Sequence, residues 1–256
     1  LRLNFLRKFL AHKTATILIQ NRYNQFETMF GIFKKKKRIK FLYSDLKPND
    51  RIRKILTEFI LPELEPLGFK LLKSELTFKR DIGDFQHTIY FQKTRWNSGN
   101  EVCKFMPHLG INSNALKKYY AKNGSKISGD LTIHNRQAEY LECWNIDFMS
   151  NAWYDLVNYD NNKVIESLRE NLLNCGMKFF KNSESETGIV DYIMSLNSYY
   201  YLTPTLFDIC KMYNKKEKAN ELLTWFRNFE KNPEKKFSDD ILESVNERET
   251  ELKNWL

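Results

Sequence analysis

The sequence predicts an α+β fold, in which an N-terminal helix packs on a small antiparallel sheet meander and a mostly helical C-terminal half follows. Three observations lead to this prediction. The 256 residues include only 9 glycines and 6 prolines, which is few for a protein built from many tight turns. The spacing of apolar residues changes from three or four to two near residue 72. It returns to the helical spacing after about residue 140.

Charge divides the chain into a basic tail, residues 1–40, and a balanced body. The tail holds 11 of the 41 lysine and arginine residues and one of the 32 acidic residues, so the body holds 30 basic and 31 acidic residues. A domain that binds nucleic acid is expected to carry positive charge on a folded face. We therefore predict that the folded body does not bind nucleic acid.

Within the tail, residues 1–28 precede Met29, where an ordinary bacterial N-terminus could begin. We predict that these residues are disordered and not part of the native protein. The block KKKKRIK that follows is typical of a solvated tail. Its alternative role is attachment to an anionic membrane surface or to nucleic acid. That role would use the side chains of Lys34, Lys35, Lys36, Lys37, Arg38 and Lys40.

The next region, residues 41–135, is predicted to hold one helix and the sheet. A stripe of apolar residues predicts a helix that begins at Asn49 or Asp50 and ends at Gly68. Alternating apolar residues then predict strands over 72–80, 85–92 and about 102–111. The first two are separated by a hairpin turn at 81–84, and Pro107 predicts a sheet edge or a bulge.

Alternation also predicts which residues share a face of each strand. In the first strand Leu72, Ser74, Leu76, Phe78 and Arg80 are expected to oppose Glu75, Thr77 and Lys79. In the second strand Phe85, His87, Ile89 and Phe91 are expected to face the core. In the third strand Cys103, Phe105, Leu109 and Ile111 are expected to share one face.

The last region, residues 136–256, is predicted to be mostly helical and to pack on the same unit, because no linker rich in Gly, Ser or Pro precedes it. Apolar spacing predicts helices over 147–157, 164–180 and 188–196, a helical hairpin over 205–228 and a final helix from Ser238 to Trp255. The hairpin resembles one tetratricopeptide unit, and without a second copy it is better interpreted as a structural cap than as a peptide-binding repeat.

The cysteines and the hydropathy predict a cytoplasmic protein. Cys103, Cys143, Cys175 and Cys210 are scattered and form no CxxC motif, so we expect four buried free thiols. No apolar run is long enough for a transmembrane segment.

No catalytic, metal-binding or cofactor motif is present in the sequence. The four histidines have no metal-ligand spacing, and no phosphate-binding glycine loop or nucleophile elbow occurs. We therefore predict a protein that is not an enzyme and uses no metal or cofactor. The alternative is an enzyme of unrecognised type, whose candidate acid/base pair is His87 or His108 with Glu75.

Three segments, Ile60–Lys70 (ILPELEPLGFK), Leu76–Trp96 (LTFKRDIGDFQHTIYFQKTRW) and Phe105–Ile111 (FMPHLGI), resemble a bacterial family known as domain of unknown function 4304. Its members share a helix that ends in LGF, a strand that ends in an aromatic residue followed by Gln-Lys, and a strand similar to NLGI, where this chain has His108 for Asn. The resemblance implies a fold and supplies no catalytic residue. Since some members lie beside toxin or defence genes, it also implies an immunity-like or defence-associated role.

The polar side of the second strand is the candidate interaction face. Tyr, Trp and Arg are the usual anchors of protein interfaces, and this strand offers all three at or just after its end. We therefore predict a non-catalytic protein-binding module. Its candidate contact residues are Gln86, Thr88, Tyr90, Gln92, Lys93, Arg95 and Trp96.

Overall fold

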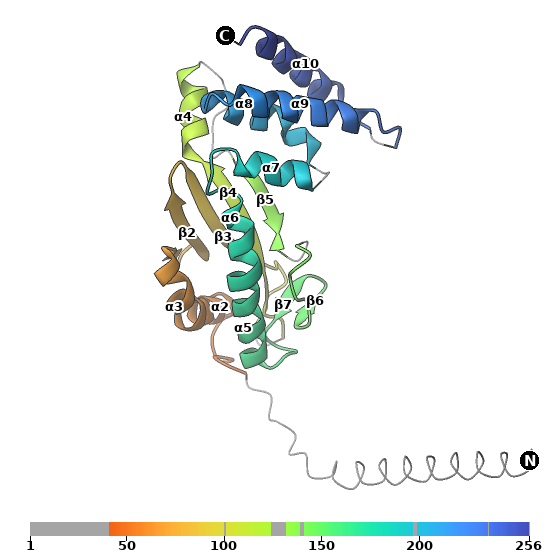
Figure 1. Ribbon diagram of the computed structural model, residues 1–256. Helices are drawn as coiled ribbons and strands as arrows, with labels where there is room; N and C mark the ends of the chain where they lie inside the picture. The colour runs from red at the N-terminus through yellow and green to blue at the C-terminus, as the bar shows by residue number, and fades with distance from the viewer. Residues whose placement is uncertain are drawn as a thin grey trace, which may run out of the picture. The chain divides into compact units, whose positions relative to one another are not determined.

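A seven-stranded antiparallel sheet organises the part of the chain that our computed structural model describes, residues 41–99, 101–123, 132–138, 141–196, 199–234 and 236–255 (Figure 1). The strands run in the order β1-β2-β3-β4-β7-β6, and β5 pairs with β4 along the edge that β7 also uses. Their bounds are β1 (Lys70–Leu72), β2 (Thr77–Ile82), β3 (Phe85–Lys93), β4 (Lys104–Ser113), β5 (Thr132–Gln137), β6 (Met149–Ser150) and β7 (Trp153–Asp155).

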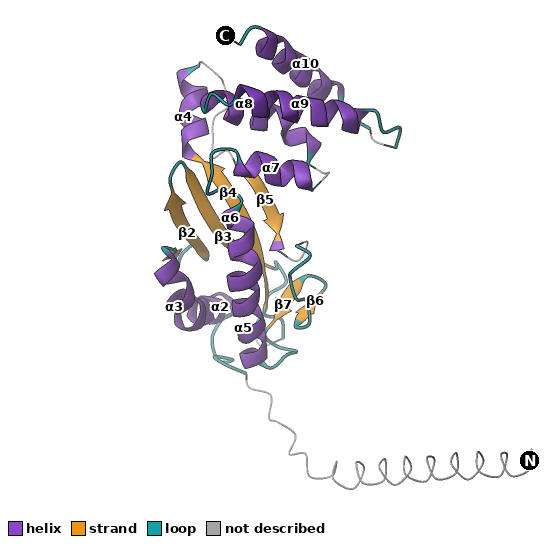
Figure 2. Ribbon diagram, in the orientation of Figure 1, coloured by secondary structure: helices purple, strands orange, loops and turns teal. Residues whose placement is uncertain are grey.

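Helical segments precede, interrupt and follow the sheet, so the predicted α+β fold is confirmed (Figure 2). Those before it are α2 (Pro48–Ile55), η1 (Leu56–Ile60), α3 (Leu61–Leu64) and η2 (Glu65–Leu67), and α4 (Asn114–Lys122) follows β4. Those after it are α5 (Asn161–Glu170), η4 (Asn171–Gly176), α6 (Met177–Lys181), α7 (Gly188–Ser195), η5 (Tyr200–Leu202), α8 (Thr203–Met212), α9 (Lys216–Glu230) and α10 (Asp239–Lys253).

The first helix begins earlier than the sequence predicts. Lys47 is its N-cap residue, so the prediction of Asn49 or Asp50 is wrong. Pro48 explains the difference, because a proline at the first helical position has the required φ and no N–H to satisfy. Helical geometry then continues to Gly68, which has φ of 86° and ends the segment as predicted.

The predicted strand over 72–80 is wrong, because the chain turns back within it. Leu76 has φ of 51°, and its carbonyl accepts a hydrogen bond from the Phe91 N–H at 3.0 Å. The turn places Leu72 opposite Thr77. Leu72 therefore shares a sheet face with Thr77. The alternation had predicted that it shares one with Phe78. The β2–β3 turn lies at Gly83 and Asp84, inside the predicted segment.

Pro107 lies within β4, and on the side of its nitrogen the strand has a local edge, as predicted. It pairs with Phe91 of β3, whose N–H points away toward Leu76. This is therefore a pair without mutual hydrogen bonds, and the nitrogen of Pro107 faces the opposite edge of β4. On that edge, β7 pairs only with Lys104 and Phe105 of β4, and the pairing with β5 starts at His108 of β4. The N–H that proline lacks is therefore not needed, because it would point between β7 and β5, where β4 has no partner strand.

The helix predicted over 147–157 is also wrong. These residues form the β6–β7 hairpin, and β7 extends the sheet beside β4. Asn151 and Ala152 have φ of 50° and 70°, as a two-residue hairpin turn requires. Ala152 occupies a position where glycine is typical, so the sequence carries no clear turn signal.

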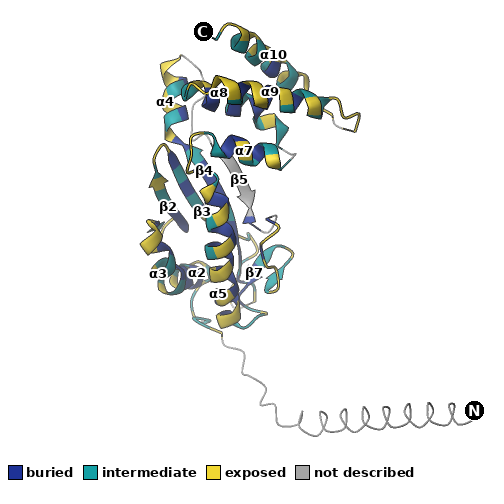
Figure 3. Cartoon of the chain, viewed as in Figure 1, coloured by how far each residue is buried: buried dark blue, intermediate teal, exposed yellow. Residues whose placement is uncertain are grey.

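A continuous helical rod, α5–η4–α6, covers one face of the sheet (Figure 1). The ring of Phe180 in α6 stacks on His87 of β3 with 4.6 Å between centroids, and it lies 5.7 Å from the ring of Phe69. Buried and exposed residues alternate along the rod at helical spacing (Figure 3). The helix predicted over 164–180 is therefore confirmed, and its apolar side closes the core.

Buried Arg51 joins the first helix to the region that follows the sheet. Its guanidinium donates to the Leu156 carbonyl and to Asn161 Oδ1, both at 2.9 Å.

The predicted helical hairpin is also confirmed, as α8 and α9. Its apolar stripes are buried, among them Leu206, Ile209, Leu222 and Phe226. Ion pairs from Arg248 to Asp208 at 2.9 Å and from Arg227 to Glu249 at 2.7 Å attach α10.

The described residues, from 41 onward, belong to one compact unit. The predictions for residues 1–28 and for the Lys34–Lys40 block lie outside the described residues. Among the residues that are described, no helix is long and apolar enough to cross a membrane.

Candidate interaction surface

The two sides of strand β3 differ in burial: one side is buried and the other is partly exposed. Phe85, His87, Ile89 and Phe91 are all buried, as the alternation predicted. On the other side Gln86, Thr88 and Gln92 are half-buried, and Tyr90 is 43% exposed. Register places Lys79 of β2 opposite Thr88 and His108 of β4 opposite Tyr90. We call these six residues, Lys79, Gln86, Thr88, Tyr90, Gln92 and His108, the open sheet face.

His108 is held as a neutral ring beside Tyr90. Its Nε2 lies 2.7 Å from Oε1 of Gln92, and because an amide oxygen only accepts, Nε2 carries the proton. Partial burial lowers the pKa of His108 below its ordinary value. The ring centroids of His108 and Tyr90 are 6.0 Å apart. Tyr90 therefore stands on a surface that carries no positive charge from this histidine at neutral pH.

The other polar groups of the open sheet face are paired locally. Gln86 Nε2 donates to Asp81 Oδ1 at 3.0 Å, and Thr88 Oγ1 donates to the Gly110 carbonyl at 3.3 Å. Lys79 Nζ lies 3.4 Å from a carboxylate oxygen of Glu75. Lys79 and Glu75 neutralise each other, Asp81 keeps its negative charge, and the Tyr90 ring is the prominent exposed group of the face.

An anchored turn presents Trp96 beyond the end of β3. The Asn97 side chain accepts from the Lys104 N–H at 2.7 Å and donates to the Lys104 carbonyl at 2.9 Å. The turn closes with the Asn97 N–H on the Thr94 carbonyl at 3.2 Å. Trp96 is 67% exposed, and the Arg95 guanidinium lies 4.6 Å from its ring centroid. Lys93 is exposed as well. Sequence reasoning missed Asn97, whose role depends on a partner seven residues away.

The structure does not bring together the acid/base pair of the enzyme alternative. His87 is buried, accepts at Nδ1 from Arg80 Nε at 3.0 Å, and lies with Nε2 2.5 Å from Ser183 Oγ. Burial and the nearby Arg80 charge lower the pKa of His87 to about 3, so the ring is neutral. Within the described residues, no hydrogen bond or ion pair joins His87 or His108 to a carboxylate, and Glu75 pairs with Lys79.

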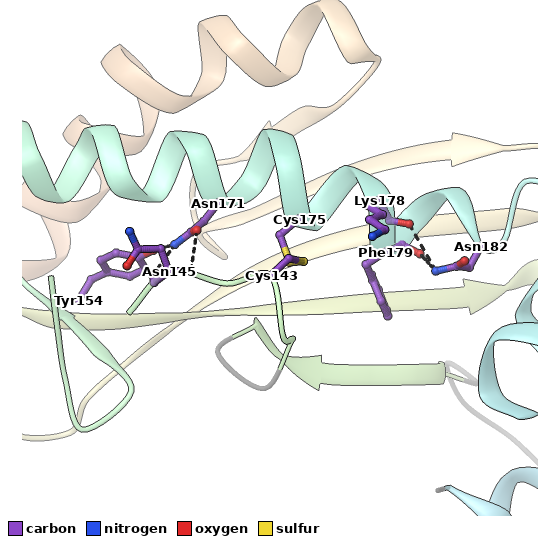
Figure 4. The surroundings of a disulfide bond; sticks show 8 residues. All are labelled: Cys143, Asn145, Tyr154, Asn171, Cys175, Lys178, Phe179 and Asn182. Carbon is purple, nitrogen blue, oxygen red and sulfur yellow. Dashed lines mark hydrogen bonds between the residues drawn. A yellow bond between two sulfur atoms is a disulfide. The ribbon is translucent and has the colours of Figure 1, made fainter. Parts of the chain in front are cut away.

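One disulfide corrects the expectation of four free thiols. Cys143 and Cys175 are bonded, with Cα atoms 5.6 Å apart, whereas Cys103 and Cys210 are free and buried as expected (Figure 4). The two bonded cysteines lie 32 residues apart in the sequence, a separation without a motif. Both line a groove of about 450 Å³ beside α6 and α7. Stable disulfides are typical of oxidising compartments, which weakens the cysteine argument for a cytoplasmic location.

Residues 60–182 match the family described as "Domain of unknown function (DUF4304)". This segment is a domain of the DUF4304 family. The match confirms the resemblance and includes the whole sheet, the helical rod, the open sheet face, Trp96 and both bonded cysteines. No curated protein and no solved structure matches the chain. Within the described residues, no group of three or more His, Cys, Asp or Glu side chains could hold a metal ion.

Proposed function

We propose that the DUF4304 domain of this chain is a non-catalytic protein-binding module whose partner contacts the open sheet face and Trp96. The observation that carries the proposal is the exposure of two large aromatic side chains, Tyr90 and Trp96, at the same end of one well-anchored strand. Tyrosine and tryptophan are enriched among the residues that dominate interface energies, because they bury much area and lose few rotamers.

A protein partner suits the chemistry of this surface better than a polyanion does. The body holds 30 basic and 31 acidic residues, and the charged groups paired at the open sheet face, Lys79 with Glu75 and Asp81 with Gln86, bring no excess of positive charge. Occlusion of a partner's surface needs no catalytic group. The immunity-like or defence-associated role that the family resemblance implies is one form of such occlusion.

The proposal is tested by comparing which proteins the chain retains from lysate when single aromatic residues are removed. We expect Tyr90→Ala and Trp96→Ala each to weaken the binding of one specific protein partner by about 2 kcal/mol, or roughly thirtyfold in Kd. Tyr201→Ala is the matched control, since Tyr201 is 52% exposed and lies outside the DUF4304 match. It should leave the recovery of that partner unchanged.

Melting temperatures of the three variants show whether lost recovery reflects a lost contact or a lost fold. The proposal is wrong if every retained protein survives both Tyr90→Ala and Trp96→Ala. A further variant replaces Lys34, Lys35, Lys36 and Lys37 by glutamine. If capture of lipid or nucleic acid disappears in this variant and with added salt, and no partner depends on Tyr90, the function belongs to the basic tail.

A further inference from the structure

The Cys143–Cys175 disulfide is unevenly exposed. Cys143 lies in the loop between β5 and β6 and is exposed, whereas Cys175 lies in the helical turn η4 and is 1% exposed. The bond thus offers one cysteine to solvent and keeps the other within the core. A thiol that approaches from outside therefore meets Cys143 first.

The groove beside this disulfide has room for a small molecule. Its volume of about 450 Å³ lies within the range of about 300–1,000 Å³ that is usual for small-ligand sites. Besides the two cysteines it is lined by Lys178 and Phe179 of α6 and by Tyr192 and Ser195 of α7. Two exposed charged residues also face the groove: Lys178, whose positive charge favours the thiolate form of an incoming thiol, and Glu142, whose negative charge offsets it beside Cys143.

We propose that this groove is a thiol–disulfide exchange site that takes a small thiol and forms a mixed disulfide at Cys143. The incoming thiolate attacks Sγ of Cys143, the Cys143–Cys175 bond breaks, and Cys175 leaves as a thiolate that then takes a proton. A second thiolate attacks the outer sulfur of the mixed disulfide and releases Cys143 as a thiolate, which takes the second proton. In total the protein disulfide gains two electrons, and two thiols become one disulfide.

The remaining cysteines do not compete in this exchange. Cys103 and Cys210 are both fully buried, and burial raises the pKa of Cys103 to about 11 and of Cys210 to about 12. Both therefore remain protonated, and a thiol is a poor nucleophile compared with its thiolate. Exchange is confined to the pair in the groove.

A second set of contacts keeps the effect of reduction local. Asn171 accepts from the Asn145 N–H at 2.9 Å, donates to the Asn145 carbonyl at 2.7 Å and donates to the Tyr154 hydroxyl at 2.8 Å (Figure 4). These bonds hold the β6–β7 hairpin near the helical rod without the disulfide. Reduction would then free the segment around Cys143, and with it one wall of the groove, while the sheet stays intact.

The test treats the full chain with reduced glutathione under native conditions, quenches with acid, alkylates the free thiols and maps the products by peptide mass. We expect a glutathione mixed disulfide on Cys143, then free Cys143 and Cys175, with Cys103 and Cys210 unmodified throughout. A mixed disulfide that maps to Cys175, or a bond that yields only after denaturant is added, would overturn the proposal.

Two matched variants isolate the role of exposure. Cys175→Ser leaves the exposed thiol and Cys143→Ser leaves the buried one, so oxidised glutathione should modify the first about tenfold faster or more. Equal rates would contradict the assignment to Cys143. If either variant fails to fold, the peptide map of the wild-type protein still decides the question.

Two further comparisons test the role of Lys178 and the size of the thiol. Lys178→Gln should slow reduction by both glutathione and mercaptoethanol several-fold, since each attacks as a thiolate and the lysine charge favours that form. A small protein with one surface cysteine should react more slowly than glutathione. An unchanged rate with both small thiols would contradict the role of Lys178, and a protein thiol as fast as glutathione would refute a groove selective for small thiols.

Discussion

The two faces of the central sheet each pair a histidine with an aromatic ring, yet the pairs differ in their surroundings. On the covered face His87 stacks on Phe180 at 4.6 Å and is fully buried. On the open face His108 lies 6.0 Å from Tyr90, which is 43% exposed. The residue types are similar, so the helical rod above one face makes the difference. A histidine–aromatic pair stabilises the fold where a helix covers it, and it remains available for a partner where none does.

The largest contrast is expected between neighbouring aromatic residues of β3. Phe91→Ala should lower the free energy of unfolding by about 3–5 kcal/mol, because the buried ring packs against Phe78 and Phe105 and its loss leaves a cavity. Tyr90→Ala should change it by less than about 1 kcal/mol, since the side chain is already 43% exposed in the folded protein. Chemical denaturation measures both. Comparable losses would show that the open face also supports the core.

The pH dependence of stability should distinguish the two histidines. The folded-state pKa of His87 is about 3, below the unfolded value of about 6.5. The contribution of His87 to the free energy of unfolding is therefore complete above pH 6.5. It falls as the pH drops toward 3, because only the unfolded state takes up the proton. Between pH 6.5 and 4 the loss is on the order of 3 kcal/mol.

Denaturation of wild type, His87→Gln and His108→Gln across this range checks the prediction. The His87→Gln variant should lose most of the acid dependence that the histidine contributes. The His108→Gln variant should lose less, because His108 is only partly buried and its pKa is lowered for that reason alone. The reverse order would contradict the assignment of the covered face.

A smaller contrast is expected between two adjacent cations of β2. Arg80 donates to His87 and to the Leu67 carbonyl, and its guanidinium lies 4.7 Å from the Phe69 ring centroid. Arg80→Ala should cost about 1–2 kcal/mol. Lys79→Ala should cost about 0.5 kcal/mol or less, because its pair with Glu75 is exposed. Equal melting temperatures for the two variants would argue against this role of Arg80.

Much of the fold could be predicted because its signals are local. The alternation of β3 and the apolar stripes of α8 and α9 repeat within a few residues, and burial follows them. The errors occur where a short apolar segment fits more than one structure. Residues 149–155 have a helical spacing, yet pairing with β4 makes them strands. At Leu76 a turn is imposed by a bond to Phe91, fifteen residues away.

The candidate surface, like the fold, could be predicted only in part. The sequence pointed to Tyr90 and Trp96 because aromatic residues in a polar strand are conspicuous. It could not point to Asn97, which fixes the Trp96 turn through the backbone of Lys104. Nor could it pair Cys143 with Cys175, since that bond depends on the rod lying beside the loop after β5.

By itself, then, the sequence determined the period of each long element and therefore which residues of β3 lie together on each side. Only the tertiary structure decided which side the rod covers, which cysteines meet and which aromatic residues reach solvent. The physical reason is the range of the interactions. Periodicity follows from the geometry of the local backbone, whereas burial and pairing require contacts between segments far apart in the chain.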